Sequence, residues 1–428
     1  MKDDNRVYLV IDLKSFFASV ECVERGLDPM TTDLVVADME RTDKTICLAV
    51  SPSLKAKGVR NRCRVFEIPK HLEYITAVPR MQKYVEYAAE IYGVYLDYIS
   101  PDDMHVYSID EVFIDITPYL KRMGLTPREM AKLLMSEVLK RVGVRATCGI
   151  GTNMYLAKIA LDITAKNSPD FIGYLDRETY INTLWDHRPI TDFWRIGPGT
   201  ARRLARIGIE TMGGVARADE ELLYKMFGVD AELLIDHAWG IEPTLISDIK
   251  SYKSKSNSLS SGQVLMRDYS FDEALIIIKE MADAMCLDMT KKHVFASSFT
   301  ISAGYSNKYN LPMVHGNVPV LVPTNEAAKV IPSVVNTFRR IVSHEIPVRR
   351  LFINANNIRP DTNEHQMTLF ELGDDGADGG ESEKNRRIQE TVNSIKSKYG
   401  KNAVLKGIDF EEVATTRDRN NQIGGHRL

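Results

Sequence analysis

Three carboxylates next to apolar stretches are the residues best placed to do chemistry in this sequence. The stretch Val106–Ile116 is rich in β-branched and aromatic residues, which predicts a strand, and it contains Asp110 and Glu111 side by side. A second apolar stretch, Val7–Ile11, runs directly into Asp12. Carboxylates from two neighbouring strands would suit hard divalent cations, which prefer oxygen ligands.

The two adjacent acids can be arranged in two ways. In an ideal strand, neighbouring side chains point to opposite faces, so one carboxylate would enter the protein core. Burial of an unpaired carboxylate is costly, and two such charges about 4 Å apart repel by roughly 4 kcal/mol at an effective dielectric constant near 20. Either one carboxylate is solvated at a sheet edge, or the pair lies at a hairpin tip and shares a cation. A three-carboxylate cluster that holds two Mg²⁺ ions is the machinery of in-line phosphoryl transfer.

Length and composition limit the architectures and locations that need to be considered. The 428 residues exceed the roughly 250–300 residues at which single cores stop growing, which predicts several domains. No apolar run approaches a membrane span and no signal-peptide pattern is visible, so we expect a cytoplasmic protein. The net charge of −3 argues against a uniformly basic nucleic-acid binder but allows a local basic face. The five cysteines are scattered, which predicts reduced thiols and no zinc site.

The acids stand inside two motifs that together resemble those of a known family. Asp12, followed by Phe16-Phe17-Ala18-Ser19-Val20-Glu21, and Ser108-Ile109-Asp110-Glu111 resemble the signature of Y-family translesion DNA polymerases, in particular the UmuC-like, UV-resistance branch. The likeness covers nearly the whole chain, with both motifs in the family's order and spacing. It implies an α+β multidomain, right-hand polymerase with a palm, small fingers, a helical thumb containing a helix-hairpin-helix, an α/β little-finger domain and a C-terminal tail.

The resemblance and the coarse pattern of the chain together predict the domain boundaries. We expect the palm in residues 1–23 and 81–170, the fingers in 24–80, the thumb in 171–242, an exposed Ser- and Lys-rich linker in 243–262, the little finger in 263–360 and the tail in 361–428. From Lys250 to Arg359 there are 14 Lys and Arg against 8 Asp and Glu, a local balance of +6. This excess supports a DNA-binding role for the little finger, although a generic α+β module with a charged surface would look similar.

The resemblance also implies a metal centre in the palm. Asp12, Asp110 and Glu111 would be the catalytic carboxylates, and the backbone carbonyl of Leu13 would be a further metal ligand. Together these groups would hold two Mg²⁺ ions, with Mn²⁺ as the alternative.

Four further residues are implied to contact the incoming nucleotide. Phe16 and Phe17 would line its site, with Phe17 as the steric gate whose ring leaves no room for a 2′-hydroxyl. Lys55 and Lys158 would contact the triphosphate. Without the motif, Phe17 would be interpreted as a core aromatic, and Lys158 as a helix-surface partner of Asp162, one turn later.

A glycine-containing turn in the thumb resembles a helix-hairpin-helix. Gly197 and Gly199 would bring backbone N–H groups close to a DNA phosphate, at the N-terminus of the next helix. Arg202 and Arg203 would add phosphate contacts that do not depend on sequence. A plain helical turn with Gly and Pro would give the same pattern.

The tail carries a short motif that resembles a sliding-clamp binding peptide. It is Gln366-Met367-Thr368-Leu369-Phe370, in which Gln366, Leu369 and Phe370 would make the contacts. Farther along, apolar residues at Ile388, Val392, Ile395 and Tyr399 predict an amphipathic helix.

The sequence therefore predicts a template-directed, low-fidelity DNA polymerase that copies past damaged bases in DNA repair or an SOS-type damage response. Its expected partners are primer-template DNA, dNTPs, the sliding clamp and accessory damage-response subunits, but no membrane; on DNA it would be associated with the nucleoid. A second acidic cluster is not evident in the sequence, so we expect no proofreading exonuclease. The first alternative is a non-catalytic scaffold of the same family that binds DNA and the clamp. A two-metal nuclease or nucleotide cyclase is the second, but it leaves the thumb, the fourth domain and the clamp-like motif without a purpose.

Overall fold

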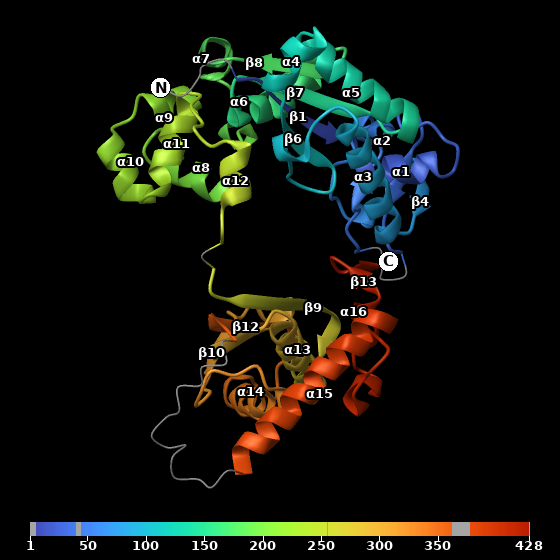
Figure 1. The fold of residues 1–428 in the computed structure, drawn as a ribbon, viewed down its shortest axis with the longest axis vertical. Coiled ribbons are helices and arrows are strands. Elements are labelled where there is room, and N and C mark those ends of the chain that lie inside the picture. Colours follow the sequence, from blue (N-terminus) through green and yellow to red (C-terminus); the bar gives the residue numbers. More distant parts are fainter. Residues whose placement is uncertain (1–5, 40–43, 255, 362–376, 428) are drawn as a thin grey trace. The chain divides into compact units, whose positions relative to one another are not determined.

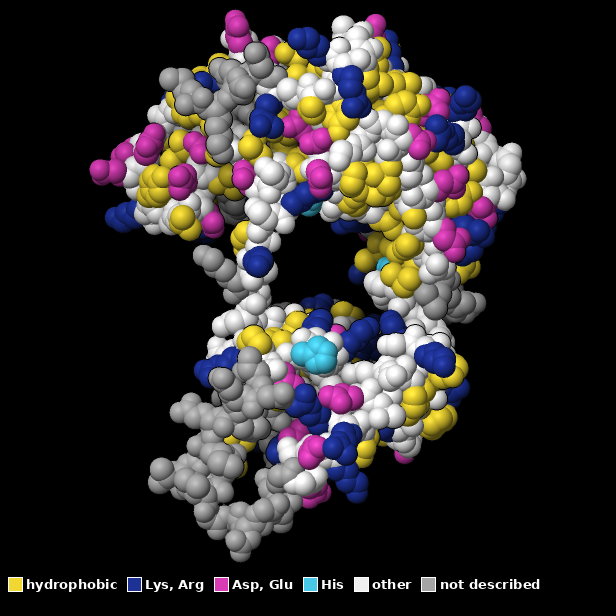
Figure 2. All heavy atoms as spheres, viewed as in Figure 1, with side chains coloured by type: hydrophobic (Ala, Val, Ile, Leu, Met, Phe, Trp, Pro, Cys, Tyr) yellow, Lys and Arg dark blue, Asp and Glu magenta, His cyan; other side chains and the backbone are white. Residues whose placement is uncertain are grey.

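The computed structural model of the chain describes residues 6–39, 44–254, 256–361 and 377–427. These residues form two compact units, 1–253 and 254–427 (Figure 1). In the described ranges, no helix has the length and apolar character needed to cross a lipid bilayer. On the face of the first unit shown in Figure 2, acidic and basic side chains are interspersed, in keeping with a net charge near zero.

The first unit is built on a five-stranded sheet that contains both acidic stretches. Its strand order is β5 (Met104–Val106), β6 (Glu111–Asp115), β1 (Tyr8–Leu13), β7 (Ala146–Gly151) and β8 (Ile172–Leu175). Neighbouring strands are antiparallel except β7 and β8, which are parallel. The central strand β1 is apolar on both faces, and all its residues except Asp12 are buried, so the acid stands at the end of a rigid core strand.

Helices pack on this sheet close to the places where the sequence predicts them. The apolar pattern predicts an amphipathic helix over Pro127–Val142, and α5 (Pro127–Val142) has these bounds, with a capping box of Thr126 and Glu129 at its start. It ends at Gly143, whose φ of 77° is left-handed. It packs against β7 and against α3 (Met81–Leu96), which the apolar pattern predicts over 81–98, two residues longer. The remaining helix of this layer is α4 (Thr117–Met123).

Helix α6 (Met154–Ile159) lies unusually close to the sheet because β7 carries two glycines. A Cβ atom on Gly149 would stand 2.0 Å from the carbonyl oxygen of Ala157, and one on Gly151 would stand 2.2 Å from the Ala157 nitrogen. The sequence predicts Asn153 as the N-cap of a helix that runs to Lys166, and Asn153 accepts a hydrogen bond from the Leu156 N–H at 2.8 Å. The helical path then continues as a π-helical turn (Ala160–Thr164) and a short 3-10 turn rather than as one α-helix.

The segment predicted as fingers forms a small three-stranded sheet, β3-β2-β4, with its own core. Its strands are β2 (Leu34–Val36), β3 (Ala49–Val50) and β4 (Ile75–Ala77), and its helices are α1 (Phe16–Val23), which leads into it, and α2 (Pro52–Ala56). The β-branched residues of Thr45–Val50 predict a strand, but β3 is shorter, because Ile46 makes only an isolated bridge to Arg64. Helix α2 begins at a proline and is capped by Ser51.

The rest of the first unit is helical and shares a core with α6. It comprises α7 (Arg177–Leu184), α8 (Pro198–Ala205), α9 (Met212–Ala216), α10 (Glu220–Phe227), α11 (Asp230–Ala238) and α12 (Ile246–Ser251). The segment predicted as an exposed linker, 243–262, contains α12 and the beginning of strand β9. Ile246 of α12 is buried against the β1 face of the sheet. One apolar anchor thus orders a stretch whose composition predicts a loop.

The second unit is a four-stranded antiparallel sheet covered on one face by two helices. The strand order is β11 (Val314–Val318), β10 (Val294–Tyr305), β12 (Val348–Pro360) and β9 (Leu259–Tyr269), and the helices are α13 (Phe271–Lys291) and α14 (Ala327–Ile341). The sequence pattern predicts a helix over Phe271–Lys291, and α13 has these bounds; it opens with a Ser270–Glu273 capping box. Leu351, Ile353 and Ala355 of β12 are fully buried in the core between sheet and helices.

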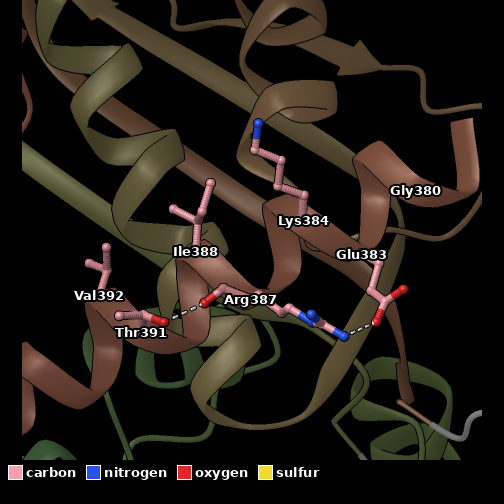
Figure 3. Close-up of a pocket in the computed structure, with 7 residues that line it drawn as sticks. All are labelled: Gly380, Glu383, Lys384, Arg387, Ile388, Thr391 and Val392. Atoms are coloured by element: carbon pink, nitrogen blue, oxygen red, sulfur yellow. Dashed lines mark hydrogen bonds and ion pairs between the residues drawn. The ribbon is translucent and has the colours of Figure 1, made fainter.

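The tail forms the predicted helix and docks on the second unit through polar groups, while Val392 and Ile395 of its apolar stripe are half-buried. Helix α15 (Ala377–Tyr399) packs against α13, with buried Gln389 donating to Thr290 Oγ1 and accepting from the Ala327 N–H. Ile388 and Tyr399 are instead 50% and 67% exposed. A shallow pocket of about 390 Å³ lies along its exposed face (Figure 3). The chain ends with α16 (Thr416–Asn420), β13 (Gln422–Ile423) and β14 (His426–Arg427).

Candidate active site

Strand register places two of the predicted catalytic acids directly opposite each other. Asp12 near the end of β1 pairs with Glu111, the first residue of β6, and on its other side with Thr147 of β7. Because residues opposite each other in a ladder share a face, both carboxylates lie on the same side of the sheet. This is the side on which Gly149 and Gly151 admit α6. The helix that carries Lys158 therefore lies over the acids.

Asp110 lies in the turn between β5 and β6, which decides between the two arrangements that the sequence left open. The Leu13 N–H donates to its backbone carbonyl at 2.9 Å, so the turn is fastened to the end of β1. The Ser108 hydroxyl donates to the Asp110 carboxylate at 2.6 Å. Asp110 and Glu111 thus occupy a hairpin tip beside Asp12, and neither enters the apolar core.

Lys158 supplies a positive charge to this cluster. Its Nζ atom lies 2.9 Å from Oε2 of Glu111 and 3.1 Å from Oδ1 of Asp162, and its side chain is only 9% exposed. Burial alone would lower the pKa of Lys158, but the two carboxylates outweigh burial and raise it. The expected helix partner Asp162 is therefore present, yet the lysine also reaches across to the sheet.

The electrostatics of the three acids are unfavourable in the absence of a further cation. Burial, together with the charges of Asp110 and Glu111, raises the pKa of Asp12 to about 7, and Lys158 only partly opposes this. Burial also raises the pKa of Glu111, although Lys158 acts in the opposite direction. Such raised pKa values indicate a site in which negative charges are concentrated and a cation would bind favourably.

The residues present fit divalent metal ions, although the described ranges contain no three Asp, Glu, His or Cys side chains already arranged around one metal position. Oxygen donors are what Mg²⁺ takes, and the Oε1 atom of Glu111 is buried without a hydrogen-bond partner among the described residues. Oε2 of Glu111 accepts a hydrogen bond from Lys158, and Oδ1 of Asp110 accepts one from Ser108. Asp12, Asp110, Glu111 and the Leu13 carbonyl are thus the groups that would hold the ions.

Phe16, Phe17 and Lys55, three of the residues predicted to contact the nucleotide, lie near the turn that follows β1. Phe16 is buried, whereas Phe17 is partly exposed and stacks on the ring of Tyr84. Lys55 of α2 donates to the Ser15 hydroxyl at 2.9 Å, in the turn that follows β1. Burial lowers the pKa of Lys55, and the nearby charge of Asp12 acts against that effect.

The predicted helix-hairpin-helix has exposed glycines and arginines. Gly197 is the N-cap of α8, and a Cβ atom on Gly197 or Gly199 would meet no other atom within 4 Å. The fold itself therefore does not need a glycine at either position, and both residues are exposed. Arg202 and Arg203 are both exposed on the same helix.

Sequence reasoning missed an aromatic bridge between this thumb segment and the acidic hairpin. The indole N–H of Trp194 donates to the Tyr107 hydroxyl at 3.2 Å, and its ring packs against Phe113 of β6. Trp194 also stacks on His237 of α11. Because these residues are far apart in the sequence, no local pattern indicated the bridge.

Comparison with known proteins identifies the family. The impB/mucB/samB family matches residues 11–162, and its C-terminal domain matches residues 256–369. UvrX of Bacillus subtilis (strain 168), a UV-damage repair protein by name, is 31% identical over 98% of this chain and 97% of its own length. The chain belongs to the UmuC-like Y-family DNA polymerases.

Other relatives agree with this assignment. DNA polymerase IV 2 of the same Bacillus subtilis strain is 29% identical to this Y-family chain over 98% of each protein. A solved Y-family polymerase chimera of Dbh and Dpo4 matches with a TM-score of 0.63 and 19% identity, covering 82% of this chain and 99% of the other. The fold is therefore the expected right hand with palm, fingers, thumb and little finger. The clamp-like residues Gln366, Leu369 and Phe370 lie outside the described residues.

Proposed function

We propose that the protein is a template-directed DNA polymerase of the translesion type, acting in the cytoplasm on damaged DNA. The observation that carries the proposal is the pairing of Asp12 with Glu111, with Asp110 in the adjoining turn, on the face covered by Lys158. This arrangement occurs in a chain of a polymerase family and matches that family's two acidic motifs. The repair names of its relatives support a role in damage tolerance or an SOS-type response.

Each part of the site has a proposed task. Asp12, Asp110 and Glu111, with the Leu13 carbonyl, would hold two Mg²⁺ ions, which when bound would activate the primer 3′-hydroxyl and neutralise the leaving pyrophosphate. Lys158 compensates part of the negative charge of the acids when no metal ion is bound. A shift of this lysine from Glu111 towards a nucleotide phosphate would couple nucleotide binding to release of the carboxylate. Lys55, partly desolvated, is a second cation for the phosphates.

Phe17 is proposed as the steric gate. It is the second residue of α1, five positions after Asp12, and its ring is partly exposed while that of the neighbouring Phe16 is buried. A ring in this position would lie against the sugar of a nucleotide whose phosphates face the acids. It would leave no space for a 2′-hydroxyl.

Primer extension with product analysis tests the proposal. Purified protein is given Mg²⁺, four dNTPs and primer-templates that are undamaged or carry one abasic site or one pyrimidine dimer. We expect distributive synthesis that is lost in the Asp110→Ala/Glu111→Ala variant, bypass of at least one lesion, and no 3′→5′ trimming. Cleavage or cyclic-nucleotide products would establish the nuclease or cyclase alternative. Absence of synthesis even with a sliding clamp and its loader would favour the non-catalytic scaffold.

The clamp itself is proposed as a partner through Gln366, Leu369 and Phe370. The support is the sequence pattern and its position after the last strand of the little finger. A Leu369→Ala/Phe370→Ala variant should lose clamp binding in pull-down or calorimetry, whereas Met367→Ala/Thr368→Ala, at the two variable positions of the motif, should retain it. Equal binding by both variants would refute the assignment.

A further inference from the structure

The partly exposed ring of Phe17 is backed by a buried tyrosine. Phe17 in the first turn of α1 stacks on Tyr84 in the first turn of α3, with ring centroids 4.5 Å apart and planes 18° from parallel. The tyrosine is 0% exposed. One face of the phenylalanine ring is therefore fixed by a neighbour that cannot itself be displaced into solvent.

The tyrosine is in turn held by a buried carboxylate. Its hydroxyl donates to Oε1 of Glu21 at 2.8 Å, and the Glu21 side chain is fully buried. Arg80 donates to both oxygens of Glu21, from Nε to Oε1 at 3.0 Å and from Nη2 to Oε2 at 2.9 Å. Arg25 donates to Oε2 as well.

This set of donors keeps the carboxylate ionised and in place. Burial by itself would raise the pKa of Glu21, but the hydrogen bonds from Arg80, Arg25 and Tyr84 outweigh burial and lower it. A bidentate arginine fixes the plane of a carboxylate as well as its position. Glu21 therefore offers the tyrosine hydroxyl an acceptor in one defined direction. That direction limits rotation of the phenol ring on which Phe17 rests.

We propose that Tyr84, anchored by Glu21, is a positioning residue that fixes the plane of the Phe17 ring and thereby sets how strongly the polymerase rejects ribonucleotides. This inference rests on the proposed role of Phe17 as the steric gate. The gate is then a stack of two rings, in which the tyrosine is held by the buried carboxylate of Glu21 and its ion pairs with Arg80 and Arg25. A gate ring without this support can tilt away from an added 2′-hydroxyl, so discrimination falls while deoxynucleotides are still accepted.

The test compares the ratio of kcat/KM for a dNTP to that for the matching rNTP. Tyr84→Phe keeps the stacked ring and removes only the bond to Glu21, whereas Tyr84→Leu removes the ring. We expect the ratio to fall roughly two- to tenfold in Tyr84→Leu, the scale of a lost aromatic-pair contact, and by a smaller factor in Tyr84→Phe. The kcat/KM for the dNTP itself should change less than the ratio.

The chain offers a matched control one turn farther along the same helix. Tyr87 donates to Glu24 at 2.8 Å, as Tyr84 does to Glu21, but it is not stacked on Phe17. Tyr87→Phe should leave the ratio unchanged. Phe17→Ala sets the largest possible loss of discrimination, and Phe17→Ala/Tyr84→Leu should lose no more than Phe17→Ala alone, because Tyr84 acts through Phe17.

Several outcomes would overturn the inference. Unchanged ratios in both Tyr84 variants, when Phe17→Ala abolishes discrimination, would show that the ring needs no support. An unchanged ratio in Phe17→Ala would remove the gate itself while leaving the polymerase proposal standing. If the wild type shows no synthesis, the proposed function is wrong. The preference for deoxynucleotides can then still be measured, as the ratio of the equilibrium affinities of dATP and ATP for the protein with primer-template and Ca²⁺. Equal preferences for wild type and Tyr84→Leu in that measurement would also refute the inference.

Discussion

Lys158 of α6 donates to Glu111 of β6 across 2.9 Å, between side chains that are each about one-tenth exposed (9% and 10%). When one partner is removed from a buried ion pair, the other charge is left uncompensated. We therefore predict that Lys158→Met lowers the free energy of unfolding of the metal-free protein by about 3 kcal/mol. Urea denaturation in EDTA, followed by tryptophan fluorescence, would measure it. The matched control is Lys83→Met, whose exposed ion pairs with Glu24 and Glu86 should be worth less than about 1 kcal/mol. Equal losses in the two variants would argue against a buried, charge-balancing lysine.

Asp12→Asn should have the opposite effect on stability. The substitution removes one of three crowded negative charges while keeping the shape of the side chain, so the metal-free protein should become more stable by on the order of 1–2 kcal/mol. Added Mg²⁺ should stabilise the wild type by roughly 2.7 kcal/mol at one hundred times its dissociation constant, and should stabilise the variant much less. Thermal unfolding with and without Mg²⁺ distinguishes these cases. A variant that is destabilised in EDTA, or that gains as much from Mg²⁺ as the wild type, would contradict the proposed metal centre.

The thumb arginines should contribute to DNA affinity through phosphate contacts alone. Arg202→Ala and Arg203→Ala should each weaken primer-template binding uniformly across sequences and reduce the slope of log K against log salt by about 1. Fluorescence anisotropy at several salt concentrations measures both quantities. Arg217→Ala, an exposed arginine elsewhere in the thumb that lies over the Trp185 ring, is the control and should leave the slope unchanged. A full salt slope in the Arg202 and Arg203 variants would show that DNA does not approach this helix.

We predict that removal of one buried carboxylate detaches the C-terminal residues from α13. Glu280 of α13 is 3% exposed and accepts hydrogen bonds from the backbone N–H groups of Thr415 and Thr416, at 3.0 and 3.2 Å. Glu280→Ala leaves these donors without their partner, at about 1–3 kcal/mol for an unsatisfied buried group. Limited proteolysis should then cut after residue 400 much faster than in the wild type. Asp288→Ala, which breaks an exposed pair with Lys292 on the same helix, should not change the rate. Equal cleavage of both variants would mean that Glu280 does not hold the tail.

Local sequence patterns were sufficient for the elements that carry the site. The apolar run into Asp12, the patterns that predict α5 and α13 and the Asn153 cap of α6 all depend on neighbours within a few positions, and the structure has them as expected. The acidic motifs predicted which carboxylates belong together. Their relative placement followed only once the register of β1 and β6 was known.

What the sequence could not provide depends on contacts between distant residues. Lys158 and Glu111 are 47 positions apart, and Tyr84 and Glu21 are 63 apart, so no period or spacing connects them. The apolar stripe on α15 predicts the helix but not the polar contacts that dock it, because buried Gln389 finds backbone and hydroxyl partners on α13 and α14 that the sequence does not reveal. Likewise, the composition of 243–262 predicts a loop, whereas burial of Ile246 orders a helix.

The measurement that tests the central claim most directly is single-nucleotide insertion with charge-neutral, isosteric changes to the acids. Purified wild type, Asp110→Asn and Glu111→Gln are mixed with primer-template, Mg²⁺ and the one dNTP that pairs with the template base, and primer extension is followed in time. The wild type should add the templated nucleotide, and each variant should be slower by roughly a thousandfold or more while still binding DNA, because metal-assisted phosphoryl transfer loses a ligand. Insertion by either variant at the wild-type rate, with extension confirmed on the same gel, would contradict an active site built from these carboxylates.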